Sequence, residues 1–282
     1  MSEGTQRGSL LVIGGHEDRV YGKDVLERFV ALAGGAGQPI VILTAASRVA
    51  ESVWEQYDEA FGALGVSDRH HLHVDSRADA NAPALADTIA RAGGIFVTGG
   101  DQKRLLALTG GTGLDKAMHA ALRNGACIAG TSAGASAMSA HMLAYGKAEL
   151  LPEKGAVGLG AGYGFLHGVV IDQHFSERNR LARLLSIVAQ NPHLIGIGID
   201  EDTALQVEAG GALEVLGSGA VTIIDGRAVI SNVSDIANHA VPELIGVQLH
   251  LLPTGSRYGI GSGEPQAPPA LADFIRTLTN IA

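Results

Sequence analysis

The chain is poor in the residues on which several classes of protein depend. Its 282 residues include one cysteine, Cys127, so no disulfide can form within the chain, and a cytoplasmic location is expected. No apolar run is long enough to cross a membrane, and the polar start, Met1 to Gly4, indicates no signal peptide. Aromatic residues make up only 4% of the chain. The core must therefore consist mainly of Ala, Val, Leu and Ile.

Positive charge is also scarce. Lys and Arg number 20 against 29 Asp and Glu, which gives a formal net charge of −9 at pH 7. Binding of nucleic acid needs a basic face that neutralises phosphates, so the composition argues against a nucleic-acid partner. Hydrophobic residues reach 46% and charged residues 17%, as expected of a folded chain with a substantial core.

Short apolar runs and helical patterns alternate along the first half of the chain. The expected strands are 9–15, 39–44, 70–75, 94–100 and a run from 126, and the expected helices are 24–33, a stretch through 53–64, 83–91 and 114–123. This alternation predicts an α/β fold, a mostly parallel sheet with helices on both faces. Functional loops should then lie at the carboxyl ends of the strands.

The second half has a higher content of expected strands. These are 169–173, 195–199, 204–207, 213–216 and 220–224, with helices at 176–190, where Ser176 would be the N-cap, and at 271–278. No repeat, charge block or linker divides the chain. A single domain over residues 1–282 is therefore expected.

The segment 126–138, ACIAGTSAGASAM, carries the most informative motif. Its centre, from Gly130 to Gly134, matches the G-x-S-x-G nucleophile elbow around Ser132. In that motif an apolar strand turns sharply into a helix, and the two glycines leave room for a serine on the strained tip. The chain contains 39 glycines, so an ordinary turn is the alternative interpretation.

A nucleophilic serine needs a base, and the base needs a carboxylate that orients it. His174 follows an expected strand and is favoured as the base, with His16 as its rival. For the carboxylate the residues leave the choice open between Glu201, Asp200 and Asp172. The order of serine, histidine and acid differs from that of the α/β-hydrolases.

Two further groups of polar residues attract attention. Arg178 and Arg180 follow His174 closely, where their guanidinium groups could meet a substrate carboxylate. His71, His73 and Asp75 would share one face of a strand, but a solvated strand end is a simpler interpretation than a metal site.

Four segments taken together resemble the cyanophycinases, serine peptidases related to aspartyl dipeptidase (peptidase E). They are GTSAGAS (130–136), GGDQ (99–102), DQHF (172–175) and GIGIDEDTAL (196–205), and the similarity extends from SLLVIGG to LLPTGSRYGI (251–260). The resemblance implies a class I glutamine amidotransferase-like (flavodoxin-like) fold with serine in the place of cysteine. It also implies release of β-aspartyl-arginine from the end of cyanophycin, a poly-aspartate backbone that carries arginines.

The same resemblance implies roles for individual residues. Ser132 would be the nucleophile, His174 the general acid and base, and Glu201 the orienting carboxylate, while Gly100 and Ala133 would supply oxyanion N–H groups. The residues implied at the substrate are Gln102, Asp172, Gln173, Arg178, Arg180 and Arg183. The mechanism requires no metal and no cofactor, and the family makes a homodimer a reasonable expectation. His16 stands where many relatives are expected to carry a smaller residue.

Two other functions compete with this interpretation. A dipeptidase that acts on short aspartyl peptides would share the triad, and a binding module would keep the fold without catalysis. A glutamine amidotransferase is disfavoured because Cys127 lies five residues before Ser132, inside the expected strand.

Overall fold

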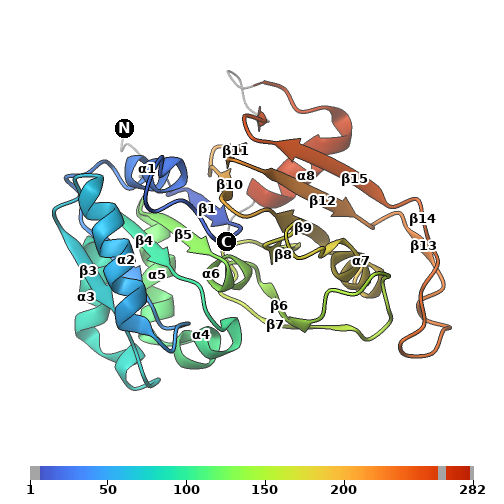
Figure 1. Ribbon diagram of the computed structural model, residues 1–282, viewed down its shortest axis with the longest axis horizontal. Coiled ribbons are helices and arrows are strands. Elements are labelled where there is room, and N and C mark those ends of the chain that lie inside the picture. Colours follow the sequence, from blue (N-terminus) through green and yellow to red (C-terminus); the bar gives the residue numbers. More distant parts are fainter. Residues whose placement is uncertain (1–6, 260–264, 280–282) are drawn as a thin grey trace, which may run out of the picture.

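A large β-sheet organises the structure, a computed structural model that describes residues 7–259 and 265–279 (Figure 1). Five of its eight strands are parallel and adjoin in the order β3, β2, β4, β5 and β1. Three antiparallel strands extend the sheet beyond β1 in the order β10, β11 and β16. The strands are β1 (Leu10–Ile13), β2 (Ile40–Leu43), β3 (Arg69–Leu72), β4 (Gly94–Val97), β5 (Cys127–Thr131), β10 (Thr203–Val207), β11 (Ala212–Gly217) and β16 (Arg257–Gly259).

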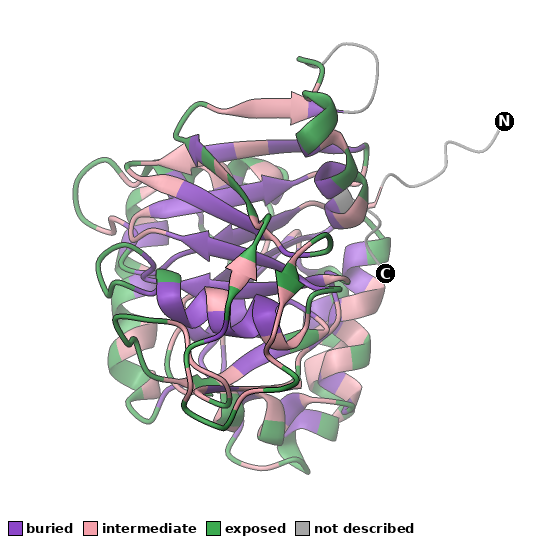
Figure 2. Cartoon of the chain, turned by 90° about the vertical axis from the view of Figure 1, so that its right-hand side faces the viewer, coloured by how far each residue is buried: buried purple, intermediate pink, exposed green. Residues whose placement is uncertain are grey.

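Helices cover both faces of the parallel part of this sheet. Side chains on a strand alternate between faces, so Leu11 and Ile13 of β1 join one core cluster while Leu10 and Val12 join the other. The first cluster includes residues of α1 (Asp24–Leu32) and α2 (Ala50–Ala63). The second includes residues of α3 (Pro83–Arg91) and α5 (Gly113–Arg123). Figure 2 shows the strands as the buried interior, with exposed residues on the outer helices and loops.

A second sheet lies beside the first and shares its core. It has the order β15-β12-β9-β8 and consists of β8 (Val169–Gln173), β9 (Ile195–Ile199), β12 (Ala220–Asp225) and β15 (Gln248–Pro253). One face joins the core cluster that contains α3, α5 and α8 (Pro269–Thr279), and α7 (Leu181–Gln190) packs on the other face. The chain therefore has the α/β fold that the sequence predicts, with the additional strands toward its C-terminal end.

The helix expected at 176–190 is shorter than predicted. Residues 175–179 form turns, and α7 begins only at Leu181. Asn179 has φ 51°, a left-handed conformation that a continuous α-helix does not contain. Ser176 is therefore not the N-cap of this helix; its hydroxyl donates a hydrogen bond to Asp200 Oδ1 at 2.6 Å.

Several elements are present that the sequence patterns did not indicate. They are α4 (Gln102–Thr109), the hairpin of β6 (His141–Gly146) and β7 (Val157–Ala161), the pair β13 (Ile230–Ser231) and β14 (Leu244–Ile245), the strands β15 and β16, and the short helix η1 (Asp79–Asn81). The short helix α6 (Ala133–Ala137) is the one that the elbow motif predicts after Ser132. Among the described residues, no helix has the length and apolar character that a membrane span requires.

Candidate active site

Ser132 occupies the turn between β5 and α6. Its backbone has φ 53° and ψ −112°, which side-chain-bearing residues rarely adopt. The serine N–H donates to the Ile13 carbonyl of the neighbouring strand β1 at 3.0 Å, which fixes the turn at the carboxyl end of the sheet. This is the strained strand-to-helix geometry of a nucleophile elbow.

Both glycines of the motif are required by close approach. A Cβ on Gly130 would lie 2.6 Å from the Gly134 carbonyl oxygen, and a Cβ on Gly134 would collide with the Val97 carbonyl of β4. The G-x-S-x-G match is thus explained by packing of the turn against its own helix and against the next strand.

His174 lies at the end of β8, in the second sheet, and reaches across to Ser132. The distance from Ser132 Oγ to His174 Nε2 is 2.9 Å. The N–H of His174 donates to the Gly14 carbonyl at 2.8 Å, and a Cβ on Gly15 would overlap the imidazole ring. The glycine pair after β1 therefore provides the surface on which the histidine rests.

Glu201 lies in the turn that follows β9 and is the third member of a hydrogen-bonded series that begins with Ser132 and His174. Its Oε1 lies 2.6 Å from His174 Nδ1. Asp200 instead accepts hydrogen bonds from the N–H groups of Ser176 and Ala220, at 3.0 and 3.1 Å. The geometry resolves the alternatives: among the three carboxylates considered from the sequence, only Glu201 contacts the imidazole.

The protonation state of His174 follows from its surroundings. Burial lowers the pKa of His174 below the ordinary 6.5, the hydrogen bond with Glu201 opposes this shift, and the charge of Arg178 adds to it. The imidazole is therefore neutral at pH 7. With Nδ1–H donating to Glu201, the lone pair of Nε2 faces the serine hydroxyl.

Two backbone N–H groups lie close to the serine. Ala133 is the first residue of α6, where no preceding turn of the helix supplies an acceptor. Gly100 follows Gly99, which lines the pocket beside Ser132, and has φ 144°, a conformation open to glycine. In the part of the chain that the structure describes, neither N–H has a hydrogen-bond acceptor.

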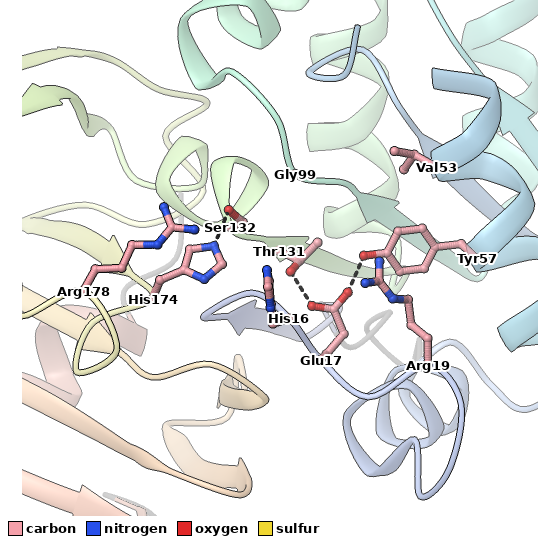
Figure 3. Close-up of a pocket in the computed structure, with 10 residues that line it drawn as sticks. All are labelled: His16, Glu17, Arg19, Val53, Tyr57, Gly99, Thr131, Ser132, His174 and Arg178. Atoms are coloured by element: carbon pink, nitrogen blue, oxygen red, sulfur yellow. Dashed lines mark hydrogen bonds between the residues drawn. The ribbon is translucent and has the colours of Figure 1, made fainter. Parts of the chain in front are cut away.

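A pocket of about 290 Å³ opens at Ser132 and extends toward α2 (Figure 3). It is lined by His16, Glu17, Arg19, Val53, Tyr57, Gly99, Thr131, Ser132, His174 and Arg178. Figure 3 shows Arg178 beside Ser132 and His174 at one end, and Arg19 beside Tyr57 at the other. The pocket thus carries a cation on each side of the serine.

Six lining residues were not among the site residues predicted from the sequence: Glu17, Arg19, Val53, Tyr57, Gly99 and Thr131. Glu17 is 2% exposed and accepts hydrogen bonds from the hydroxyls of Tyr57 and, at 2.6 Å, Thr131. Burial and the carboxylate of Glu17 raise the pKa of Tyr57. The guanidinium carbon of Arg19 lies 5.2 Å from the Tyr57 ring centroid. For Glu17 and Arg19 the sequence signal was the polar run directly after β1, at the strand end where a functional loop is expected. Gly99 and Thr131 lie inside the GGDQ and GTSAGAS motifs.

Most residues that the resemblance places at the substrate are buried. Asp172 is 0% exposed, and its carboxylate bonds to Arg183, with Nε to Oδ2 at 2.9 Å, and to Arg180 at 3.3 Å. Burial lowers the pKa of Arg180 to about 10, and Asp172 opposes the shift. Gln173 accepts from Arg180 at 2.9 Å, and Gln102 donates to the Leu143 carbonyl of β6 at 3.0 Å. Within this set only Arg178 lines the pocket.

Metal ligands converge at one place among the described residues. A ring nitrogen from His16, one from His174 and a carboxylate oxygen from Glu201 all lie within 4.8 Å of one another. His71 and His73, which the sequence puts on one strand face, instead share Thr44 Oγ1 as a hydrogen-bond partner, at 2.9 and 3.1 Å.

Ser132, His174 and Glu201, joined by two hydrogen bonds, have the arrangement of the catalytic groups in serine hydrolases. Residues 10–215 match the family described as Peptidase family S51. The chain therefore belongs to peptidase family S51, and it is a hydrolase of the peptidase type, as the resemblance in its sequence predicts.

Known relatives are similar in sequence to this chain along almost its whole length. A cyanophycinase of Geminocystis herdmanii (strain PCC 6308) is 38% identical over 263 residues, which cover 93% of this chain and 97% of that protein. A cyanophycinase of Synechococcus elongatus is 38% identical over 262 residues, which cover 92% and 81%. The crystal structure of a peptidase from an acI-B1 Actinobacterium superposes with a TM-score of 0.68 at 23% identity, covers 91% of this chain and 98% of that one, and supports the fold.

Proposed function

We propose that this chain is a serine exopeptidase that hydrolyses cyanophycin and releases β-aspartyl-arginine dipeptides. The observation that carries the proposal is the hydrogen-bonded series of Ser132, His174 and Glu201, at 2.9 and 2.6 Å, in a chain of peptidase family S51. Relatives named cyanophycinase over nine-tenths of the chain support the choice of substrate.

The chemistry follows from the geometry of the series. Ser132 Oγ attacks the scissile carbonyl carbon while its proton passes to His174 Nε2. The N–H groups of Ala133 and Gly100 stabilise the oxyanion, and Glu201 stabilises the imidazolium. His174 then donates the proton to the leaving amine. Water attacks the resulting ester by the same route in reverse, which releases the acyl group and restores the serine.

The cations at the pocket suit the carboxylates of the proposed substrate. Each unit of cyanophycin presents one guanidinium and one free carboxylate, that of its arginine, because both aspartate carboxyl groups are in amide bonds. Arg178 at one end of the pocket is exposed for such a carboxylate. Arg19 at the other end lies over the Tyr57 ring and offers a second carboxylate site. Asp172, Arg180 and Arg183 are buried and contribute indirectly. Arg180 donates a hydrogen bond to the side chain of Gln173 and holds it in place, and Arg183 is bonded to Asp172.

The test is to incubate the protein with purified cyanophycin and, separately, with short aspartyl peptides, and to identify products by mass spectrometry. Wild type should release β-aspartyl-arginine from the polymer, while Ser132→Ala should release none. Hydrolysis of short peptides alone would transfer the assignment to an aspartyl dipeptidase. A wild-type chain that hydrolyses neither would contradict the proposal and leave a binding module.

Other features of the proposed enzyme rest on composition and family. We place it in the cytoplasm because its single cysteine, Cys127, is buried and unpaired. A net charge of −9 supports the absence of a nucleic-acid partner. The homodimer follows from the family alone, and light scattering of the purified protein would test it. No step of the mechanism uses a metal or cofactor.

A further inference from the structure

We propose that His16, His174 and Glu201 bind one divalent ion of the zinc class, and that the bound ion inhibits the enzyme. The three side chains come from three separate loops, after β1, β8 and β9, yet one potential ligand atom of each lies within 4.8 Å of the others. His16 Nδ1 and Glu201 Oε2 are 3.4 Å apart.

The ligand set suits zinc in composition and geometry. Two imidazoles and one carboxylate, with a fourth position open to water, form a common zinc site. Ligand atoms about 2.0–2.1 Å from a tetrahedral ion lie about 3.4 Å from one another. The separation between His16 and Glu201 already has this value. The side chain of His16 is 68% exposed, so it can adjust toward an ion without disturbing the core.

Binding of the ion and catalysis exclude each other. His174 Nε2 is bonded to Ser132 and Nδ1 to Glu201, so an ion on either nitrogen removes one hydrogen bond of the series. Coordination of Glu201 also takes the carboxylate that orients the imidazole. The ion is therefore an inhibitor and not a cofactor of the reaction. This consequence rests on the proposed function, whereas formation of the site does not.

Binding is measured first, without reference to activity. Wild-type protein is freed of metal with a chelator, dialysed, and titrated with zinc in a calorimeter and with cobalt(II) in a visible absorption experiment. We expect one ion per chain and the absorption bands of a tetrahedral cobalt site. His16→Ala should weaken zinc binding at least about tenfold, since it removes one of three ligands.

The matched control is His193→Ala. His193 lies near His141, with ring centroids 6.3 Å apart, but this pair joins no metal-ligating group among the described residues. The control should bind zinc as wild type does. Equal affinity in wild type and His16→Ala, or a loss of affinity in the control instead, overturns the proposed site.

Inhibition is measured next, with cyanophycin and chelator-treated enzyme. Zinc should abolish hydrolysis at the concentration that fills the site, excess chelator should restore it, and His16→Ala should need at least about tenfold more zinc relative to its own metal-free rate. Zinc that binds stoichiometrically without inhibition overturns the inhibitory role. Absence of hydrolysis in metal-free wild type contradicts the proposed peptidase function, while the calorimetric result still decides the site.

Discussion

Ser132, the proposed nucleophile, holds a strained backbone conformation with φ 53°. Ser132→Ala removes the hydroxyl and keeps the strain, whereas Ser132→Gly removes both. Both variants should lose hydrolysis by about a thousandfold or more. In chemical denaturation the glycine variant should be more stable than the alanine variant by about 1 kcal/mol. Equal or reversed stabilities would show that the turn stores no strain at Ser132.

The pH dependence of hydrolysis follows from His174. Only the neutral imidazole accepts the serine proton, so the rate should rise as pH increases through the pKa of His174, which lies below the ordinary 6.5. The rate should reach its half-maximum below pH 6.5 in buffer that contains a chelator. Arg178→Gln removes a positive charge that lowers this pKa, and it should move the midpoint of kcat upward. A wild-type midpoint above 6.5 contradicts this account.

A substitution at Arg19 tests whether the end of the pocket near Tyr57 binds a carboxylate of the substrate. Arg19→Gln removes a guanidinium that would bind a substrate carboxylate, and such a bond contributes about 1.5 kcal/mol. We expect KM to increase about tenfold with little change in kcat. Arg123→Gln, an exposed position at the end of α5, is the control and should behave as wild type. A kcat loss without a KM change would exclude this carboxylate-binding role.

At the scale of elements, the buried ion pairs join β8 to α7. Asp172 of β8 is fully buried against Arg180 and against Arg183 of α7, and Arg183 also donates to the Gly146 carbonyl at the end of β6 at 2.8 Å. The packing of β8, α7 and the end of β6 against one another therefore depends on the carboxylate of Asp172. Each of these groups is desolvated, so removing one charge leaves others buried without compensation.

Asp172→Asn should destabilise the fold by about 3–5 kcal/mol, because it leaves two buried guanidinium groups without their carboxylate. The control is Asp273→Asn, which breaks a pair with Arg227 in which the aspartate is 59% exposed and should cost about 1 kcal/mol or less. Both values come from urea denaturation followed by circular dichroism. A cost for Asp172→Asn no larger than that of the control contradicts the structural role.

Sequence patterns identified most strands of the two large sheets, but they missed β15, β16 and the helix α4. Buried strands such as β1 and β9 are continuous apolar runs, and such runs can be recognised from the sequence without knowledge of the tertiary contacts. The end of the 176–190 helix was predicted correctly, but its predicted start was five residues too early, because no local pattern indicates the left-handed conformation of Asn179. The helix α4 was missed although Asp101 caps it, accepting from the N–H groups of Lys103 and Arg104.

The candidate site was predictable for a different reason. Ser132 and His174 each follow an apolar strand, and the carboxyl end of such a strand is where a functional loop is expected, although the two strands belong to different sheets. Residue spacing left Glu201 and Asp200 as alternatives, and the family resemblance favoured Glu201; the two lie close together in the chain, and only tertiary contacts separate their partners. The same holds for Asp172, whose burial no local pattern encodes.

At the scale of the whole molecule, one core cluster includes side chains of both large sheets. Ile128 and Leu205 of the first sheet and Ile171 and Ile197 of the second belong to the same buried group. This arrangement supports the expected single domain. Calorimetry should record one thermal transition, with a van't Hoff enthalpy close to the calorimetric enthalpy. Two resolved transitions would instead indicate sheets that unfold independently.

The glycine turn after β1 also has a consequence for folding kinetics. Ser132 belongs to the first sheet and His174 to the second, and the hydrogen bond from His174 N–H to the Gly14 carbonyl spans the two. A refolding chain with both sheets formed but not yet docked would show full secondary structure and no turnover. Hydrolysis must then be the last signal to recover during refolding, so the chain has no peptidase activity until the two sheets have docked.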